Sequence, residues 1–122
     1  MKTPKLAIVE LSVRDWPKAV AWFRNHFHLS LKMEHVSEEY ALLETGGVQL
    51  AIKGDPQVVV GDQVLLQWEV ADVAECLTEL VAAGVNIIKP MKTSDEGYRR
   101  IVVEGPEGMS LLLFDWSVPK KE

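Results

Sequence analysis

Two stretches of the chain alternate apolar and polar residues, and an amphipathic segment follows each of them. IVELSV, beginning at Ile8, precedes an aspartate and the segment WPKAVAWF, while LLQWEV, beginning at Leu65, precedes an aspartate and the segment VAECLTEL. Strict alternation is typical of a strand with one buried face, and apolar residues at helical spacing are typical of a helix with one buried stripe. The pattern therefore predicts the succession strand, aspartate, helix twice along the chain.

The two aspartates, Asp15 and Asp72, stand where each helix is expected to begin. A short side-chain oxygen at this position can accept the free N–H groups of the first helical turn. Glu75, three residues after Asp72, completes a pattern that resembles a capping box, and Gly84 is a natural end for the second helix. The beginnings of both helices are thus predicted from local chemistry alone.

Three further strand patterns follow each predicted helix. They cover residues 31–36, 39–44, 48–53, 85–89, 99–104 and 110–116. Gly46-Gly47 and the segment Gly105-Pro106-Glu107-Gly108 precede the last strand of each half, and aligning Gly46 with Gly108 sets Leu50 opposite Leu112. The fold class predicted is α+β, with two tandem βαβββ modules.

The length of 122 residues accommodates one compact domain with its own core. We expect residues 5–55 to form the first module, 56–63 a connector, 64–116 the second module and 117–122 a frayed tail. Residues 1–122 are therefore expected to form a single domain.

Composition narrows the classes of function. The formal net charge is -5, and the basic residues are scattered, which argues against a nucleic-acid partner. No apolar run approaches the length needed to cross a membrane, and the start of the chain lacks the pattern of a signal peptide, so we expect a cytoplasmic protein. The single cysteine, Cys76, lies on an apolar stripe and is interpreted as a core side chain.

The order of these motifs resembles the vicinal oxygen chelate superfamily, which includes glyoxalases, bleomycin resistance proteins and extradiol dioxygenases. The motifs that carry the resemblance are LSVRDWPKAVAWF, WEVADVAECLTEL, the Gly46-Gly47 turn before VQLAI, and the closing GPEGMSLLLF. The resemblance implies that the two modules form a curved, cup-like mixed sheet with the helices on its outer face.

The resemblance also implies four metal-ligand positions, one on the first and one on the last strand of each module. In this chain they fall on Ile8, Leu50, Leu65 and Leu112. Aliphatic side chains offer no donor atom to a divalent cation, so we expect no metal and no other cofactor. The three histidines, His26, His28 and His35, are interpreted as surface residues rather than as replacement ligands.

Strand parity predicts which side chains accompany those positions in the cup. The candidate ligand-binding residues are apolar or polar side chains of the first and last strands, with one arginine from the strand before the last: Glu10, Ser12, Leu50, Gln67, Glu69, Arg100, Leu112 and Phe114. Such a mixture suits a small organic ligand, and the carboxylates add a preference for cationic compounds. The alternative is that the polar residues form the solvated face of an antiparallel sheet and that Arg100 has only an edge-strand role. Trp116 is expected to cap a pocket or an interface.

Three functions remain open from the sequence. The first is a metal-free small-molecule-binding homodimer that resembles the bleomycin resistance branch, whose members bind cationic drugs. The second is a glyoxalase- or dioxygenase-related lyase, isomerase or oxygenase with an atypical site, in which Glu10 or Glu69 is the general base; no catalytic residue is otherwise assigned. The third is a partner module whose cup is filled by its own side chains.

Overall fold

We analysed a computed structural model of the chain, which describes residues 1–3, 5–59, 61 and 64–116. The predicted tail, residues 117–122, and part of the predicted connector lie outside the described residues. Contacts between Cα atoms divide the chain into two units, Met1–Val59 and Val60–Glu122, and each unit is described by itself. Within the described residues, no helix is both long and apolar enough to cross a membrane.

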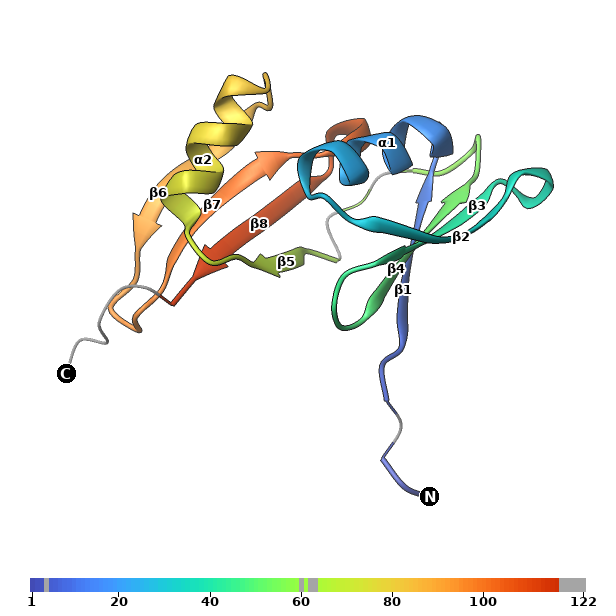
Figure 1. The fold of residues 1–122 in the computed structure, drawn as a ribbon, viewed down its shortest axis with the longest axis horizontal. Helices are drawn as coiled ribbons and strands as arrows, with labels where there is room; N and C mark the ends of the chain where they lie inside the picture. The colour runs from blue at the N-terminus through green and yellow to red at the C-terminus, as the bar shows by residue number, and fades with distance from the viewer. Residues whose placement is uncertain (4, 60, 62–63, 117–122) are drawn as a thin grey trace. The chain divides into compact units, whose positions relative to one another are not determined.

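The first unit is a four-stranded mixed sheet with one long helix (Figure 1). Its elements are β1 (Ile8–Val13), α1 (Trp16–His26), β2 (Ser30–His35), the short 3₁₀ helix η1 (Val36–Glu38), β3 (Tyr40–Glu44) and β4 (Gln49–Gly54). The strand order is β1-β4-β3-β2, in which β1 runs parallel to β4 and the other neighbours are antiparallel.

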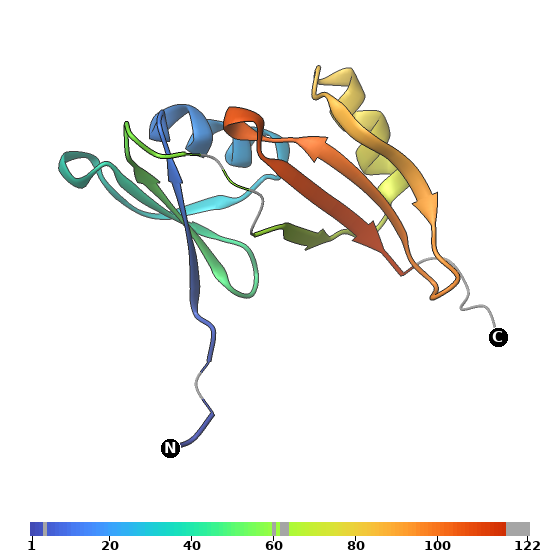
Figure 2. The same cartoon turned by 180° about the vertical axis from the view of Figure 1, so that it is seen from behind.

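The second unit repeats this topology. Its elements are β5 (Leu66–Glu69), α2 (Val73–Ala82), β6 (Ile87–Thr93), β7 (Arg99–Glu104), the 3₁₀ helix η2 (Pro106–Gly108) and β8 (Ser110–Asp115). The strand order is β5-β8-β7-β6, with a parallel β5–β8 pair and antiparallel neighbours elsewhere. In Figure 2 the strands of this sheet lie in front of α2. The predicted α+β class and the two βαβββ modules are confirmed.

Both helices begin at the predicted aspartates. The side chain of Asp15 accepts a hydrogen bond from the amide of Lys18 at 3.1 Å, and that of Asp72 accepts one from the amide of Glu75 at the same distance. Gly84 follows the C-cap of α2 with a φ of +82°, a conformation that favours glycine. The local signals in the sequence therefore set these helix ends correctly.

Each helix covers one face of its own sheet. In the first unit, Phe23 of α1 is buried with Val13, Leu43 and Ile52, and a Cβ atom on Gly54 would lie 2.9 Å from the ring of Trp16. In the second unit, the buried side chains on the α2 side belong to β7 and β8 and include Ile101, Val103, Leu111 and Leu113. Two small cores therefore stabilise the chain, one beneath each helix.

A buried carboxylate joins the last strand of the second unit to the start of α2. Asp115 is 1% exposed, and its Oδ2 accepts hydrogen bonds from the amide of Val73 at 2.6 Å and from Arg99 Nη2 at 2.8 Å. Arg99 also donates through Nε to Asp115 Oδ1 at 3.2 Å and through Nη2 to Asp72 Oδ1 at 3.3 Å. The hydrogen bonding of Arg99 to the carboxylate of Asp115, which accepts, is the main reason that the pKa of Arg99 is raised above its ordinary value.

The register of the first sheet corrects one prediction about the site. β1 and β4 pair with Val9 beside Leu50 and Glu10 beside Ala51. Paired residues of neighbouring strands point to the same face, so Leu50 lies on the helix-covered face, where it is 3% exposed. The prediction that Leu50 shares a face with Glu10 and Ser12 is wrong.

The cause of this error is the position of the glycine within each turn. Gly46 lies three residues before Gln49, the first residue of β4, whereas Gly108 lies two residues before Ser110, the first residue of β8. Aligning the two glycines therefore shifts β4 by one residue against β8, and a shift of one residue exchanges the two faces of a strand.

The network around Asp115 predicts a large loss of stability for Asp115→Ala. The substitution leaves the amide of Val73 and the guanidinium of Arg99 without their buried partner, so the free energy of unfolding is expected to fall by about 2–4 kcal/mol. Urea denaturation followed by circular dichroism measures this change. Glu79→Gln, on the exposed side of α2, is the control and is expected to alter stability by less than about 0.5 kcal/mol. Equal effects of the two substitutions would contradict a stabilising role for the network.

The register also predicts opposite outcomes for lysine at two adjacent positions of β4. Leu50→Lys places an ammonium group in the core beneath α1 and is expected to lower the free energy of unfolding by several kcal/mol, about 3 or more. Gln49→Lys places the same group beside Glu44 on the other face and is expected to change it by less than about 1 kcal/mol. Thermal denaturation of the two variants checks this, and the reverse ranking would show that β4 is shifted by one residue.

Candidate functional site

The candidate site residues lie on the faces of the sheets that the helices leave uncovered, which we call the distal faces. The first distal face carries Ile8, Glu10, Ser12, Tyr40, Leu42, Glu44, Gln49, Ala51 and Lys53. The second distal face carries Gln67, Glu69, Arg100, Val102, Glu104, Ser110, Leu112 and Phe114. Each set follows from the strand register. The set for the first distal face therefore excludes Leu50, which the sequence suggested, and includes its neighbours Gln49 and Ala51.

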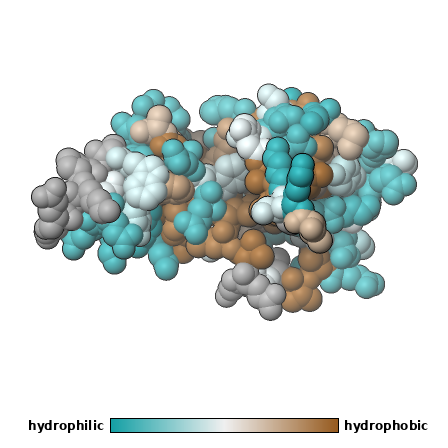
Figure 3. All heavy atoms as spheres, turned by 90° about the horizontal axis from the view of Figure 1, so that it is seen from below, coloured by the Kyte–Doolittle hydropathy of each residue, from teal (hydrophilic) through white to brown (hydrophobic). Residues whose placement is uncertain are grey.

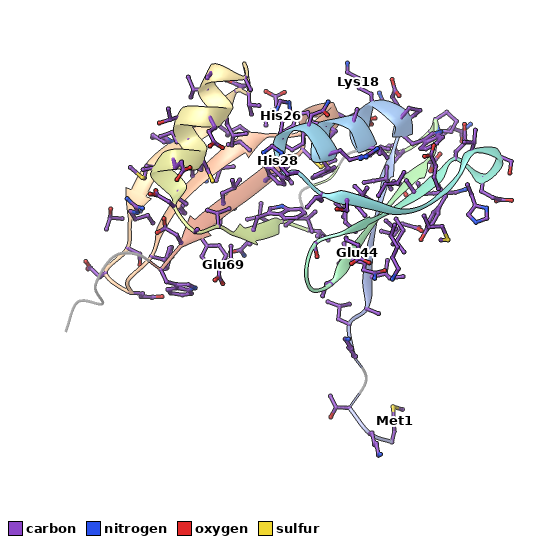
Figure 4. All side chains as sticks on the ribbon, in the orientation of Figure 1. Met1, Lys18, His26, His28, Glu44 and Glu69 are labelled. Carbon is purple, nitrogen blue, oxygen red and sulfur yellow. The ribbon has the colours of Figure 1, made fainter. Side chains whose placement is uncertain are left out.

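The second distal face brings together five of the eight predicted residues. Gln67 pairs with Leu112 and Glu69 pairs with Phe114 across the parallel β5–β8 ladder, while Arg100 pairs with Phe114 from the other side. Gln67 and Glu69 are exposed, and the other three are half-buried. In Figure 4 the side chain of Glu69 projects from β5 toward solvent. The prediction that these five residues share one face of the sheet is therefore correct. Their role in binding remains a prediction.

The first distal face is polar and internally paired. Lys32 Nζ lies 3.3 Å from Glu44 Oε1, and the side-chain nitrogen Nε2 of Gln49 donates to the same oxygen at 3.3 Å. Glu10 and Ser12 are exposed on β1, beside Ala51 and Lys53 of β4. This face thus offers hydrogen-bonding groups together with the exposed side chain of Ile8 and the half-buried ring of Tyr40.

An aromatic cluster marks one end of the second sheet. The ring of Trp116 meets the rings of Tyr98 and Phe114 edge-on, with centroids 5.6 Å apart in both cases. Trp116 is 59% exposed, although a side chain of this size usually has most of its surface buried. The sequence analysis did not include Tyr98 and Trp116 among the binding residues. The alternation of Leu112, Phe114 and Trp116 is the signal that could have assigned Trp116 to the cluster.

Arg100 is held by its own sheet. Its Nη1 donates to the backbone oxygen of Pro90 in β6 at 2.9 Å, so the guanidinium links β7 to the edge strand. β7 is an inner strand of the sheet, so the edge-strand role that the sequence allowed for Arg100 is wrong, although its side chain bonds to the edge strand β6. This contact also fixes a positive charge beside Phe114, the partner residue of Arg100 on β8.

The residues at the implied metal positions do not fit a divalent cation. Ile8, Leu65 and Leu112 carry no donor atom, and Leu50 lies on the helix-covered face. Gln49, the residue before Leu50, lies on the distal face, and its side-chain amide nitrogen donates to Glu44 Oε1. No group of three or more His, Cys, Asp or Glu side chains in the described parts of the chain is arranged to hold a metal ion. No catalytic step through a metal is therefore derived.

The single thiol is poorly suited to act as a nucleophile. Cys76 is half-buried on α2, and burial, followed by the nearby carboxylates Glu79 and Glu75, raises the pKa of its thiol. A raised pKa lowers the fraction of thiolate at neutral pH, and the thiolate is the reactive form. Cys76 is half-buried and is not among the buried core side chains of α2, so the core position predicted from the apolar stripe is not observed.

Comparison with solved structures places this fold among known proteins. The chain is 26% identical to TioX from Micromonospora sp. ML1, with a TM-score of 0.75 over 92% of this chain and 98% of that one. It is 19% identical to a glyoxalase/bleomycin resistance protein/dioxygenase family enzyme from Burkholderia phytofirmans PsJN, with a TM-score of 0.79 over 92% and 98% of the two chains. Lactoylglutathione lyase from Agrobacterium tumefaciens is 15% identical, with a TM-score of 0.78 over 96% and 97%.

A comparison of sequences agrees with the structural one. No curated protein matches the chain. The sequence profile of the Glyoxalase/Bleomycin resistance protein/Dioxygenase superfamily, however, matches residues 5–113, which span both βαβββ modules. The chain therefore belongs to the Glyoxalase/Bleomycin resistance protein/Dioxygenase superfamily.

Proposed function

We propose that this protein binds a small apolar ligand without a metal and prefers cationic aromatic compounds, and that the second distal face supplies the binding residues. The observation that carries the proposal is the aromatic cluster of Tyr98, Phe114 and Trp116, with Glu69 paired to Phe114 on the neighbouring strand. Aromatic faces attract cations, and a nearby carboxylate adds to the attraction.

Each part of this surface has a distinct role in the proposed binding. The exposed ring of Trp116 stacks on the ligand, and Phe114 with Leu112 supplies the apolar floor beside it. Glu69 accepts the positive charge, while Gln67 orients the ligand through its amide. Arg100, held by Pro90, stands on the far side of Phe114 from Glu69, so a cationic ligand is expected to lie toward β5.

A ligand on the face of a sheet needs further cover, because small-molecule sites are concave and bury most of the ligand. We propose that a second copy of the chain supplies part of this cover in a homodimer. β1 and β5 are edge strands of their sheets, and Ile8 and Leu65, near the start of each, are 46% and 44% exposed. Figure 3 shows exposed hydrophobic residues among polar ones. Edge strands and exposed apolar side chains are common at interfaces.

The charge preference is tested with two probes of nearly equal shape, N-methylquinolinium and quinoline. At pH 7.5 the first is a cation and the second is neutral. We expect N-methylquinolinium to bind at least about threefold more tightly, because a cation over an aromatic face gains about 0.5–1 kcal/mol at an exposed site. Isothermal titration calorimetry measures both affinities.

Two substitutions separate the parts of this site. Glu69→Gln is expected to remove the preference for the cation. Trp116→Ala is expected to lower the affinity for both probes about tenfold, since a stacked ring contributes about 1–1.5 kcal/mol. Glu79→Gln on α2 is the matched control and leaves both affinities unchanged. Binding of neither probe at millimolar concentration would contradict the proposed function, and equal binding of both would contradict the preference for cationic compounds.

The homodimer is tested by sedimentation equilibrium. The chain has a mass of 13.7 kDa, and we expect a species of about twice that mass at micromolar concentration. Replacing the exposed apolar residue Leu65 by aspartate is expected to shift the equilibrium toward the monomer, while Val81→Asp on α2, which also replaces an exposed apolar residue, serves as the control. A mass of 13.7 kDa up to 100 µM, roughly the upper working range for a specific dimer, would count against the dimer.

A further inference from the structure

A groove runs along α1 in the first unit, on the side of the sheet opposite to the first distal face. Its volume is about 640 Å³, which is within the range of small-molecule sites. The lining side chains come from α1, from the turn that follows it and from β2, and the ones that matter here are Trp16, Val20, Arg24, His28, Leu29 and Glu34. None of these residues belongs to the face proposed above for the cationic ligand.

A β-bulge places the acidic residue in this groove. β2 pairs with β3 so that Leu31 lies beside Leu43, but Met33 lies beside Leu42 and Glu34 beside Ala41, which leaves Lys32 as the extra residue. Without the bulge, Met33 would face the helix and Glu34 would face away from it. Bulges often redirect side chains near binding sites, and this one exchanges an apolar side chain for a carboxylate on the helix side.

A left-handed backbone conformation places the histidine. His28 directly follows the C-cap of α1 with a φ of +57°, a position at which glycine is the favoured residue. Figure 4 shows His28 at the end of α1, where the chain turns toward β2. A histidine in this conformation is uncommon, and its side chain lines the groove.

The charged groups of the groove have no partners within their own unit. Arg24 and Glu34 are exposed and form no salt bridge or hydrogen bond through their side chains with any of the described residues, and the same holds for His28. Between them the floor is apolar, since Val20 is buried and Leu29 is half-buried. The groove thus presents a positive group on α1, a negative group on β2 and an apolar surface within one concave site.

We propose that this groove binds a small zwitterion with an apolar body, such as an apolar α-amino acid. The carboxylate of the ligand contacts Arg24 and His28, its ammonium group contacts Glu34, and its side chain packs on Val20, Leu29 and the ring of Trp16. A simple acid leaves the charge of Glu34 without a partner, and a simple amine leaves the charge of Arg24 without one. The site therefore distinguishes a zwitterion from a simple acid or amine.

The test uses three compounds that share one phenyl group: L-phenylalanine, 3-phenylpropionate and phenethylamine. Titration of the ¹⁵N-labelled full-length protein up to 20 mM ligand, a concentration that detects roughly millimolar binding, is followed by shifts of the backbone amides. We expect L-phenylalanine to shift the amide resonances of the second half of α1 and of the residues around Glu34. We also expect it to bind at least about threefold more tightly than 3-phenylpropionate or phenethylamine.

Variants test whether the named side chains carry this binding. Arg24→Gln and Glu34→Gln are each expected to reduce the affinity for L-phenylalanine at least about threefold. His28→Gly is expected to weaken binding while keeping or raising Tm, because glycine relieves the left-handed conformation. Lys18→Gln is the control, since Lys18 projects from α1 away from the sheet (Figure 4).

Two results would overturn the proposal. One is the absence of localised shifts around the groove with any of the three compounds, and the other is equal binding of all three, which would indicate only contact with the phenyl group. Neither result bears on the second distal face, because its residues lie in the other unit and are probed with different ligands. Loss of binding in His28→Gly with a lowered Tm would assign His28 to the fold and not to the ligand.

Discussion

Each half of this protein depends on one interaction, the burial of a single apolar sheet face beneath a single helix. Four strands and one helix form each unit, and their cores consist of side chains that alternate along the strands, such as Val13 and Ile52 in the first unit and Ile101 and Leu113 in the second. Because strand side chains alternate with a period of two, this burial also decides which residues face away from the helix. The chemistry of the distal faces therefore follows from the packing of the cores.

The two units share a topology but differ in the chemistry that they present. On the first distal face, Glu44 is shared between Lys32 and Gln49, which leaves a paired polar surface. On the second, the rings of Phe114 and Trp116 lie at the opposite end of the sheet, where β8 ends. A repeated fold thus carries two different surfaces, as is expected when stability resides in the shared core and specificity in the residues outside it.

Small departures from regular structure account for the most specific features of the chain. The bulge at Lys32 brings Glu34 to the helix side of the first sheet, and the left-handed residue His28 turns the chain at the end of α1. In the second unit, both oxygens of the buried Asp115 side chain accept hydrogen bonds, from Arg99 and from the backbone amide of Val73. Each of these features has an energetic cost that a regular strand or helix would not have.

The sequence by itself determined the two βαβββ modules, the helix starts at Asp15 and Asp72, and the residues of the second distal face, because capping and alternation are local properties read along one segment. It also determined that Ile8, Leu65 and Leu112 offer no metal donor, which is a matter of side-chain chemistry. The face of Leu50 depended on the tertiary structure, since Gly46 and Gly108 lie at different distances from the strands that follow them and register arises from pairing between strands. The tertiary structure likewise decided the positions of Glu34, Trp116 and Asp115, because a bulge, a ring contact and a buried ion pair each join segments that are distant or irregular in sequence.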